Sequence, residues 1–179
     1  MMSPACLLLL VLPLASAINF NWGPCPSPSV QANFTFQRFM GKWYEIESLP
    51  NPLETSQCVE ANFLVDVYGK AVVIFTSTVD NRVEKIEGSV HQDIGEPAKL
   101  QISHYYCEPS PWWVLATDYT NVAAIYSCTS ILNYFHLESI WIASRTRSLP
   151  PEVVQEAKMV FQRNNIDVSK LVPADQTGC

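Results

Sequence analysis

The chain has 179 residues, of which 48% are hydrophobic and 16% charged, and its formal net charge is −6. This length suits one domain with a substantial core, and the apolar composition excludes a disordered chain. The 11 Lys and Arg residues are outnumbered by 17 Asp and Glu residues. Because the basic residues also form no run, the composition argues against nucleic acid as a partner.

The N-terminus has the pattern of a secretory signal peptide. An apolar run at residues 7–14 is followed by Ala15-Ser16-Ala17, the small-x-small pattern that signal peptidase accepts. The run is shorter than the roughly 20 apolar residues of a membrane span. We therefore predict a cleaved signal peptide at residues 1–17, a single domain at 18–179, and a secreted, extracellular protein.

Secretion changes the expected chemistry of the cysteines, because disulfides persist in oxidising compartments. Cys6 falls in the predicted signal peptide, which leaves Cys25, Cys58, Cys107, Cys128 and Cys179. An odd number means that one thiol is free or bonded to another molecule. The sequon Asn33-Phe34-Thr35 makes Asn33 a candidate for N-glycosylation, which agrees with secretion.

Most of the remaining chain alternates apolar and polar residues, the pattern of half-buried strands. In residues 58–67, for example, Val59, Ala61, Phe63 and Val65 fall on one face. In chain order the pattern predicts strands at 43–48, 58–67, 71–78, 83–91, 100–106, 112–117, 122–129 and 137–144. About eight short strands with turn residues between them indicate an antiparallel sandwich or barrel, and alternation alone leaves both open.

One helix is predicted after the last strand. Pro150-Pro151 opens a segment whose apolar residues recur at steps of three and four, and the pattern ends near Asn164. The apolar positions are Val153, Val154, Ala157, Val160 and Phe161.

Three short motifs favour the barrel over the sandwich. Gly41-Lys42-Trp43 stands at the first strand, Thr117-Asp118-Tyr119 lies between the sixth and seventh strands, and Arg145 follows the last strand. In this order they resemble the three signature regions of the lipocalin family. The resemblance implies an all-β fold: an eight-stranded antiparallel up-and-down β-barrel with one closed and one open end, and one C-terminal helix packed outside. Such a barrel has room for one small ligand.

The resemblance also assigns structural tasks to the signature residues. Trp43 is expected to plug the closed end, with the Arg145 guanidinium over its ring in a cation-π contact. Gly41 would let the backbone pass close beneath. We therefore expect the signature residues Gly41, Trp43, Thr117, Asp118, Tyr119 and Arg145 to support the fold and not to bind ligand.

The resemblance further pairs Cys25 with Cys128 and Cys58 with Cys179. Cys107 is then left over, in a connection that the barrel topology places at the open end. We hypothesise that Cys107 is an exposed thiol that supports a disulfide-linked dimer or a redox role. The alternative is a buried, inert thiol in a monomer.

Alternation also predicts the lining of the barrel. If Phe63 faces inward, the ligand-binding residues are Phe63, Phe75, Ile102, His104, Tyr106 and Trp141. His104 would contact a ligand carboxylate or hydroxyl, or else merely fill the wall or reach water at the rim. Glu45 and Glu47 share the alternation of Trp43, so we expect a strand bend or bulge to change their phase.

The open end is predicted to carry an apolar mouth. Its residues are Trp112, Tyr134 and Phe135, and a clustered apolar rim often marks contact with lipid, ligand or protein. The mouth is therefore expected to touch lipoprotein or membrane surfaces. The alternative is a lid that folds over the cavity.

These features predict a secreted carrier of a small hydrophobic ligand such as a fatty acid or steroid. The sequence contains no common hydrolase, zinc-protease or phosphate-loop motif, and its histidines lack metal spacing. No catalytic residue, metal or cofactor is therefore expected. One alternative is a thiol enzyme similar to the prostaglandin-isomerising lipocalins, which would need a free Cys58. The other is an antioxidant or interaction protein that acts through the mouth with an empty barrel.

Overall fold

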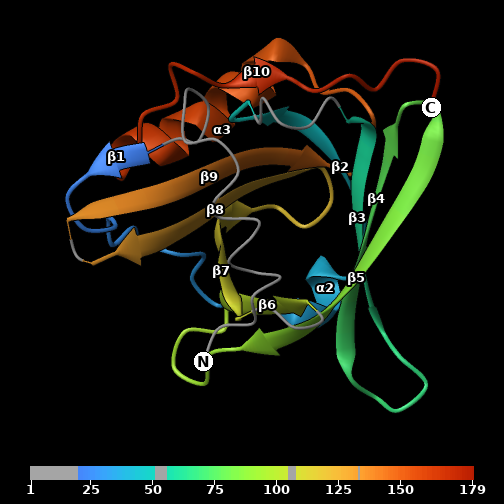
Figure 1. The fold of residues 1–179 in the computed structure, drawn as a ribbon, viewed down its shortest axis with the longest axis horizontal. Coiled ribbons are helices and arrows are strands. Elements are labelled where there is room, and N and C mark those ends of the chain that lie inside the picture. Colours follow the sequence, from blue (N-terminus) through green and yellow to red (C-terminus); the bar gives the residue numbers. More distant parts are fainter. Residues whose placement is uncertain (1–19, 51–55, 105–107, 133) are drawn as a thin grey trace.

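The strands of the computed structural model, which describes residues 20–50, 56–104, 108–132 and 134–179, form one antiparallel sheet (Figure 1). Strands β2 to β9 pair with their neighbours in sequence order, and pairing of β9 with β2 closes them into a barrel. These strands are β2 (Gly41–Ser48), β3 (Gln57–Val65), β4 (Ala71–Val79), β5 (Arg82–Gln92), β6 (Lys99–His104), β7 (Ser110–Thr117), β8 (Val122–Ile131) and β9 (Phe135–Ser144). The eight-stranded barrel predicted from the sequence is confirmed, with strand ends within two residues of the prediction.

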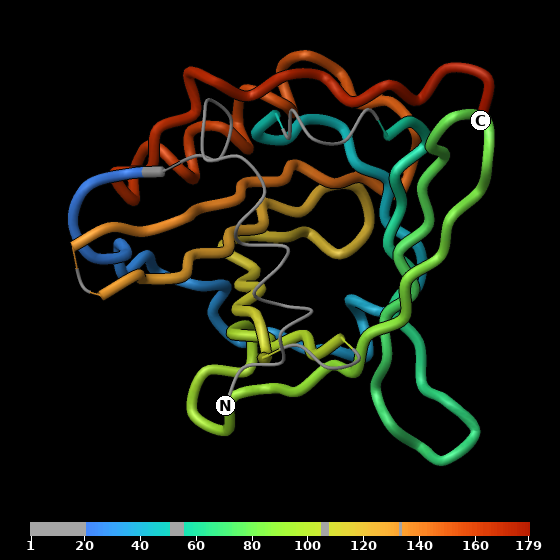
Figure 2. The backbone as a smooth tube through the Cα atoms, viewed as in Figure 1, coloured from blue at the N-terminus to red at the C-terminus, as the bar shows by residue number. Residues whose placement is uncertain are grey.

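Three short elements were not predicted. Strand β1 (Phe20–Trp22) pairs with the start of β9, and β10 (Val172–Pro173) pairs with the end of β2. Helix α2 (Phe36–Phe39) precedes β2. Figure 2 follows the blue N-terminal segment beside β9 and the red C-terminal segment across the outside of the barrel. Elements of two to four residues are too short to produce a periodic pattern, which is why alternation did not reveal them.

The single predicted helix is confirmed as α3 (Pro151–Arg163), which packs against the outer face of β7, β8 and β9. Pro151 begins the helix, where its missing N–H costs no hydrogen bond. Val154, Ala157 and Phe161 are buried and lie on one face.

The apolar core therefore has two layers separated by the barrel wall. One lies inside the barrel and is built around Phe39, Trp43, Phe63 and Trp112. The other lies between the wall and α3, and includes Tyr126, Ile140, Ile142 and Phe161. Because side chains of a strand alternate between faces, β8 and β9 supply both layers. Two-sided burial explains the continuous apolar runs at residues 122–126 of β8 and 140–143 of β9.

Candidate functional site

The closed end of the barrel is filled by aromatic side chains. Trp43 is buried, and the Arg145 guanidinium carbon lies 3.7 Å from the centroid of its ring. The ring of Phe39, supplied by α2, stacks on Trp43 with 4.8 Å between centroids, and the Trp43 Nε1–H donates to the Phe39 carbonyl at 2.8 Å. The signature residues thus form the base of the barrel, as the resemblance implied.

Arg145 also bonds to two segments that are distant from it and from each other in sequence, one at residues 40–42 and one at Tyr119. Its Nε donates to the Tyr119 carbonyl at 3.0 Å, its Nη1 to the Lys42 carbonyl at 2.8 Å and its Nη2 to the Met40 carbonyl at 2.9 Å. Gly41 has a φ of +94°, and a Cβ there would lie 3.3 Å from Arg145 Nη1. A glycine is therefore required both by the backbone conformation and by the approach of the guanidinium.

The turn that follows β7 is held by the second signature motif. Asp118 Oδ1 accepts hydrogen bonds from the backbone N–H groups of Thr120, Asn121 and Val122. Burial raises the pKa of Asp118, but these hydrogen bonds outweigh it and hold the pKa below its ordinary value. The Thr117 hydroxyl closes the turn by donating to the Val122 carbonyl at 2.8 Å.

Towards the open end, the barrel encloses a cavity of about 580 Å³. Most of its lining is apolar, with a few polar side chains. The lining residues are Trp43, Glu45, Val59, Glu60, Ala61, Phe75, Ile86, Ile102, His104, Ser110, Pro111, Trp112, Ile125, Ser127, Ser139, Trp141 and Ala143. A largely apolar cavity of this size has the character of a small-molecule site.

Four of the predicted ligand residues line this cavity, namely Phe75, Ile102, His104 and Trp141. Phe63 faces inward as predicted but is not in the lining. It is packed below the cavity against Phe39 and Trp112, with centroids at 5.4 and 5.1 Å. Alternation predicts on which face of a strand a residue lies and not its height in the barrel, which is why Phe63 was misplaced. Tyr106 lies outside the described residues.

The prediction that Trp112 belongs to the mouth is wrong. Trp112 is buried inside the barrel, and its ring lies 6.2 Å from that of Trp141. Its neighbour Trp113 faces outward instead, beneath Lys99 and beside Tyr126. Two adjacent tryptophans in a strand must point to opposite faces, and Trp112 takes the inner one.

A glycine that sequence reasoning overlooked shapes the wall beside His104. Gly88 of β5 pairs with His104 of β6. A Cβ at this position would lie 2.8 Å from Ile102 Cγ2 and 3.1 Å from the His104 ring. The sequence contained a signal for this contact, because a glycine inside a strand often marks a place where a neighbouring group approaches the backbone closely.

The predicted bulge in β2 is present, and it separates the two glutamates. The pairing of β2 with β9 shifts between Glu45, opposite Ala143, and Glu47, opposite Ile142. Glu47 consequently faces outward and forms a 2.7 Å ion pair with Lys158 of α3. Glu45 precedes the bulge, so it keeps the inward phase and lines the cavity.

The open end carries an exposed apolar patch, which we call the rim patch and define as Trp22, Leu132, Tyr134 and Phe135. The exposed fractions of the first three side chains are 82%, 81% and 71%. Trp22 packs on Phe135 with 4.6 Å between ring centroids. Tyr134 and Phe135 thus lie where the mouth was predicted, and the unpredicted strand β1 adds Trp22.

Buried polar groups hold β1 against the wall. His136 Nδ1 donates to the Gly23 carbonyl at 2.9 Å, and Asn21 Nδ2 donates to Glu138 Oε1 at 2.9 Å. The Tyr126 hydroxyl donates to Glu138 Oε2 at 3.1 Å. Burial and the Glu138 carboxylate raise the pKa of Tyr126. These contacts fix the position of Trp22 in the rim patch.

Both disulfides implied by the resemblance are present. Cys25 is bonded to Cys128 and Cys58 to Cys179, across sequence separations of 103 and 121. The described part of the chain contains no free cysteine, and Cys107 lies outside it. Because Cys58 is bonded, its sulfur does not offer the thiol that the enzyme alternative requires.

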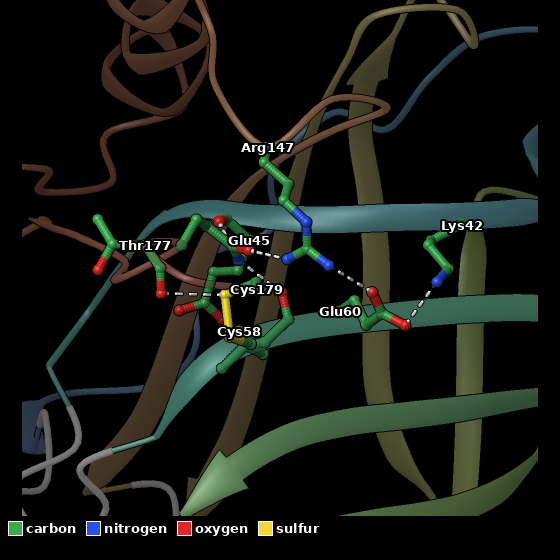
Figure 3. Close-up of polar contacts among 9 residues, drawn as sticks. Lys42, Glu45, Cys58, Glu60, Arg147, Thr177 and Cys179 are labelled. Atoms are coloured by element: carbon green, nitrogen blue, oxygen red, sulfur yellow. Dashed lines mark hydrogen bonds and ion pairs between the residues drawn. A yellow bond between two sulfur atoms is a disulfide. The ribbon is translucent and has the colours of Figure 1, made fainter. Parts of the chain in front are cut away.

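The C-terminal segment is tied to the outside of β2 and β3 by polar contacts (Figure 3). The Gln176 Nε2 donates to the Glu45 and Val59 carbonyls at 3.0 and 2.9 Å. Arg147 donates to Gln176 Oε1 at 2.6 Å and approaches Glu60 to 3.5 Å. These bonds and the Cys58–Cys179 disulfide brace the wall near the cavity.

Asn33 is exposed, in a turn with a φ of +52°. Among the described residues, no group of three His, Cys, Asp or Glu residues is arranged to hold a metal ion. In the same part of the chain, no helix has both the length and the apolar character needed to span a membrane.

Comparison with known proteins agrees with this geometry. Residues 34–176 match the family profile described as Lipocalin-like domain. The chain belongs to the lipocalin family. This lipocalin is 44% identical to apolipoprotein D of Cavia porcellus over 163 residues, which cover 89% of this chain and 86% of the relative. It is 41% identical to apolipoprotein D of Oryctolagus cuniculus over 186 residues, covering 99% and 98%.

Solved structures show the same fold. Insecticyanin from the tobacco hornworm Manduca sexta superimposes with a TM-score of 0.80 and 28% identity, covering 90% of this chain and 91% of that one. Lobster apocrustacyanin A1 superimposes with a TM-score of 0.76 and 25% identity, covering 93% and 94%.

Proposed function

We propose that this lipocalin is a secreted carrier that holds one small hydrophobic molecule in its barrel. The observation that carries the proposal is the largely apolar cavity of about 580 Å³, closed below by Trp43. Transfer of apolar ligand surface from water into such a cavity is favourable by about 25 cal/mol per Å². The apolipoprotein D relatives support the same assignment by their overall similarity.

Tryptophan fluorescence tests the carrier function. Trp141 lines the cavity, so a bound steroid or fatty alcohol should quench its emission saturably with a stoichiometry of about one. Trp141→Phe should lose a large part of the quenching while native mass spectrometry still detects the complex. Trp22→Phe is the control, because Trp22 lies outside the barrel and is exposed. If neither tryptophan quenching nor native mass spectrometry detects a bound ligand, the result favours the alternative of an interaction protein with an empty barrel.

A second activity, contact with a lipid surface, is favoured by the rim patch. Three large apolar side chains are more than two-thirds exposed beside one another, and one of them is the amphipathic Trp22. Such a patch suits insertion at a lipoprotein or membrane interface while the ligand exchanges.

Flotation with phosphatidylcholine vesicles tests this contact. Tyr134→Ser with Phe135→Ser should reduce the bound fraction several-fold. Val67→Ser with Tyr68→Ser is the matched control, because these two side chains are 92% and 83% exposed at the opposite end of the barrel. Equal flotation of both double variants and the wild type would refute the proposed role of the rim patch.

Secretion is proposed from the signal peptide pattern at residues 1–17, and the two disulfides support it. N-terminal sequencing of the secreted protein should begin at residue 18. Glycosidase treatment should lower the apparent mass, and Asn33→Gln should abolish that shift. The exposure of Asn33 supports this modification.

Cys107 remains the cysteine without an assigned partner in the proposed mature chain. We propose that it either forms an intermolecular disulfide or remains a reactive thiol. Non-reducing electrophoresis should show a dimer that Cys107→Ser removes, or alkylation of the native protein should label one thiol. If the protein shows no dimer and no labelled thiol, the result supports a buried, inert thiol instead.

A further inference from the structure

Two serine side chains lie opposite each other on the inner face of the barrel wall. Ser127 of β8 and Ser139 of β9 are partners in the antiparallel pairing of these strands, which run side by side in Figure 1. Both residues line the cavity. The Cβ atoms of opposite residues on one face of a sheet are about 4.5 to 5.5 Å apart. The two hydroxyl groups are therefore close enough to hydrogen-bond to one shared oxygen atom.

These hydroxyl groups have no partner within the protein. In the part of the chain that the structure describes, no hydrogen bond joins the hydroxyl of Ser127 or Ser139 to another group. Neither oxygen is sealed off by neighbouring atoms, so both are accessible from the cavity. The lining residue Glu60, in contrast, already forms a 2.8 Å ion pair with Lys42. The serine pair is therefore a polar feature of the wall that the packing of the barrel does not use.

The serine pair lies above an apolar section of the same two strands. The inward-facing pairs between the serines and the closed end are Ile125 with Trp141 and Ala123 with Ala143. Because a strand rises about 3.3 Å per residue, the section from Ser139 down to Ala143 is about 13 Å long. A ligand that fills the cavity against this wall thus meets apolar side chains first and the two hydroxyls at the end nearer the mouth.

Unpaired hydroxyls in a cavity discriminate between ligands with and without an oxygen atom. A serine hydroxyl donates one hydrogen bond and accepts others, so it suits a hydroxyl or carbonyl oxygen. A ligand without such an oxygen would remove the hydroxyls from water and leave them unpaired, which is unfavourable. A site built to hydrogen-bond a ligand oxygen therefore rejects the analogue that lacks it.

We propose that Ser127 and Ser139 form a subsite that binds a hydroxyl or carbonyl oxygen of the ligand, with the apolar part of the ligand directed towards Ile125 and Trp141. The subsite rests on the proposed carrier function. It narrows the ligand class to hydrophobic molecules that carry a hydroxyl or carbonyl oxygen at one end of an apolar body, and it fixes their orientation in the barrel.

Two probes of nearly equal shape test the subsite by isothermal titration calorimetry. They are 4-phenylphenol and 4-methylbiphenyl, which differ only in a hydroxyl group that replaces a methyl group. The methyl probe is the more hydrophobic, yet the wild type should bind 4-phenylphenol at least as tightly. Ser127→Ala with Ser139→Ala should shift the ratio of the two affinities towards 4-methylbiphenyl by about tenfold, and each single variant should shift it by about threefold.

Ser130→Ala is the matched control, because it makes the same change on β8 at a residue that does not line the cavity. The Ser130 hydroxyl accepts a hydrogen bond from the Cys25 N–H at 3.3 Å instead. This variant should leave the affinity ratio unchanged. Far-ultraviolet circular dichroism verifies that each variant is folded.

Thermal denaturation separates a binding role of the serines from a structural one. Because the two cavity hydroxyls have no partner in the protein, the double alanine variant should melt at the wild-type temperature or above it. A lower melting temperature together with an unchanged affinity ratio would assign the serines to the stability of the wall and refute the subsite.

The remaining outcomes separate the subsite from the carrier function. If both probes bind and the double variant leaves their affinity ratio as it is, the subsite is refuted and the carrier function stands. If the folded wild type binds neither probe but binds a steroid or fatty alcohol, the subsite is refuted as well. If it binds none of these molecules, the carrier function fails and the subsite fails with it.

Discussion

The closed and open ends of this barrel are built from the same alternating strands, yet they expose their apolar residues in opposite ways. At the closed end, Phe39 and Trp43 are at most 1% exposed and are locked by Arg145. At the open end, Trp22 and Tyr134 are exposed to solvent, and the barrel below them contains the cavity. The difference shows that packing density, and not hydrophobicity as such, distinguishes the end that holds the fold together from the end that binds.

The largest expected effect comes from emptying the closed end. Phe39→Ala removes a fully buried ring that contacts Phe34, Trp43, Phe63 and Trp112. It should lower the free energy of unfolding by about 3 to 5 kcal/mol, measured by urea denaturation.

The corresponding change at the cavity is Phe75→Ala. Phe75 is only partly buried and borders empty space, so its loss should cost less than about 2 kcal/mol but weaken ligand binding. Equal destabilisation by the Phe39 and Phe75 variants would contradict the division between the two ends.

Arg145→Ala is the second strongest test. It removes the cation-π contact with Trp43 and leaves carbonyl groups of Lys42, Met40 and Tyr119 without their donor. We expect a loss of about 2 to 3 kcal/mol and a lower melting temperature in calorimetry. Ligand stoichiometry should stay at about one. Loss of binding with unchanged stability would place Arg145 in the binding site instead.

Gly88→Ala tests the open end of the barrel, where the cavity lies. The added methyl group would meet Ile102 at 2.8 Å and the His104 ring at 3.1 Å, so both side chains must shift into the cavity. The dissociation constant of a cavity ligand should rise several-fold, with a stability cost of about 1 to 2 kcal/mol. Gly95→Ala is the control, because it makes the same substitution in an exposed turn. The same ligand is titrated against both variants. If Gly88→Ala binds the ligand as tightly as the wild type, a shift of His104 does not restrict the cavity.

The smallest effect is expected from the turn at the closed end. The pKa of Asp118 is lowered, so its hydrogen bonds stabilise the fold above the ordinary carboxyl pKa of about 3.9, and this contribution disappears as the pH falls through the lowered value. Asp118→Ala should cost less than about 1 kcal/mol at pH 7, because the group is exposed and screened. The difference from wild type should shrink below about pH 4 in urea denaturation. A constant difference across pH would exclude the carboxylate charge as its cause.

The sequence anticipated much of the closed end and only part of the cavity. The resemblance to the lipocalins implied that Arg145 lies over Trp43, and the structure confirms this contact. Alternation identified Phe75, Ile102 and Trp141 as lining residues, since it distinguishes the two faces of a strand. It did not distinguish levels within the barrel, so Phe63 was expected in the cavity and lies beneath it.

Alternation also fails to predict side-chain facing where two adjacent residues are of the same type and where a strand contains a bulge. Trp112 and Trp113 are alike in type, so alternation alone did not reveal that Trp112 faces inward. The bulge in β2 was expected, but its position between Glu45 and Glu47 depends on how β2 pairs with β9. That position keeps Glu45 in the lining of the cavity and turns Glu47 outward to Lys158, and it was not readable from either strand alone.

The sequence by itself determined the eight strands, the helix and the lipocalin family, because periodicity and local motifs are properties of neighbouring residues. Only the tertiary structure decided which apolar residues fill the base, which border the cavity, and which stand at the rim with Trp22. These assignments depend on strand register, on the bulge and on the contact between β1 and β9, all of which join residues far apart in the chain. Long-range pairing therefore sets the chemistry of the cavity, while local pattern sets the wall that surrounds it.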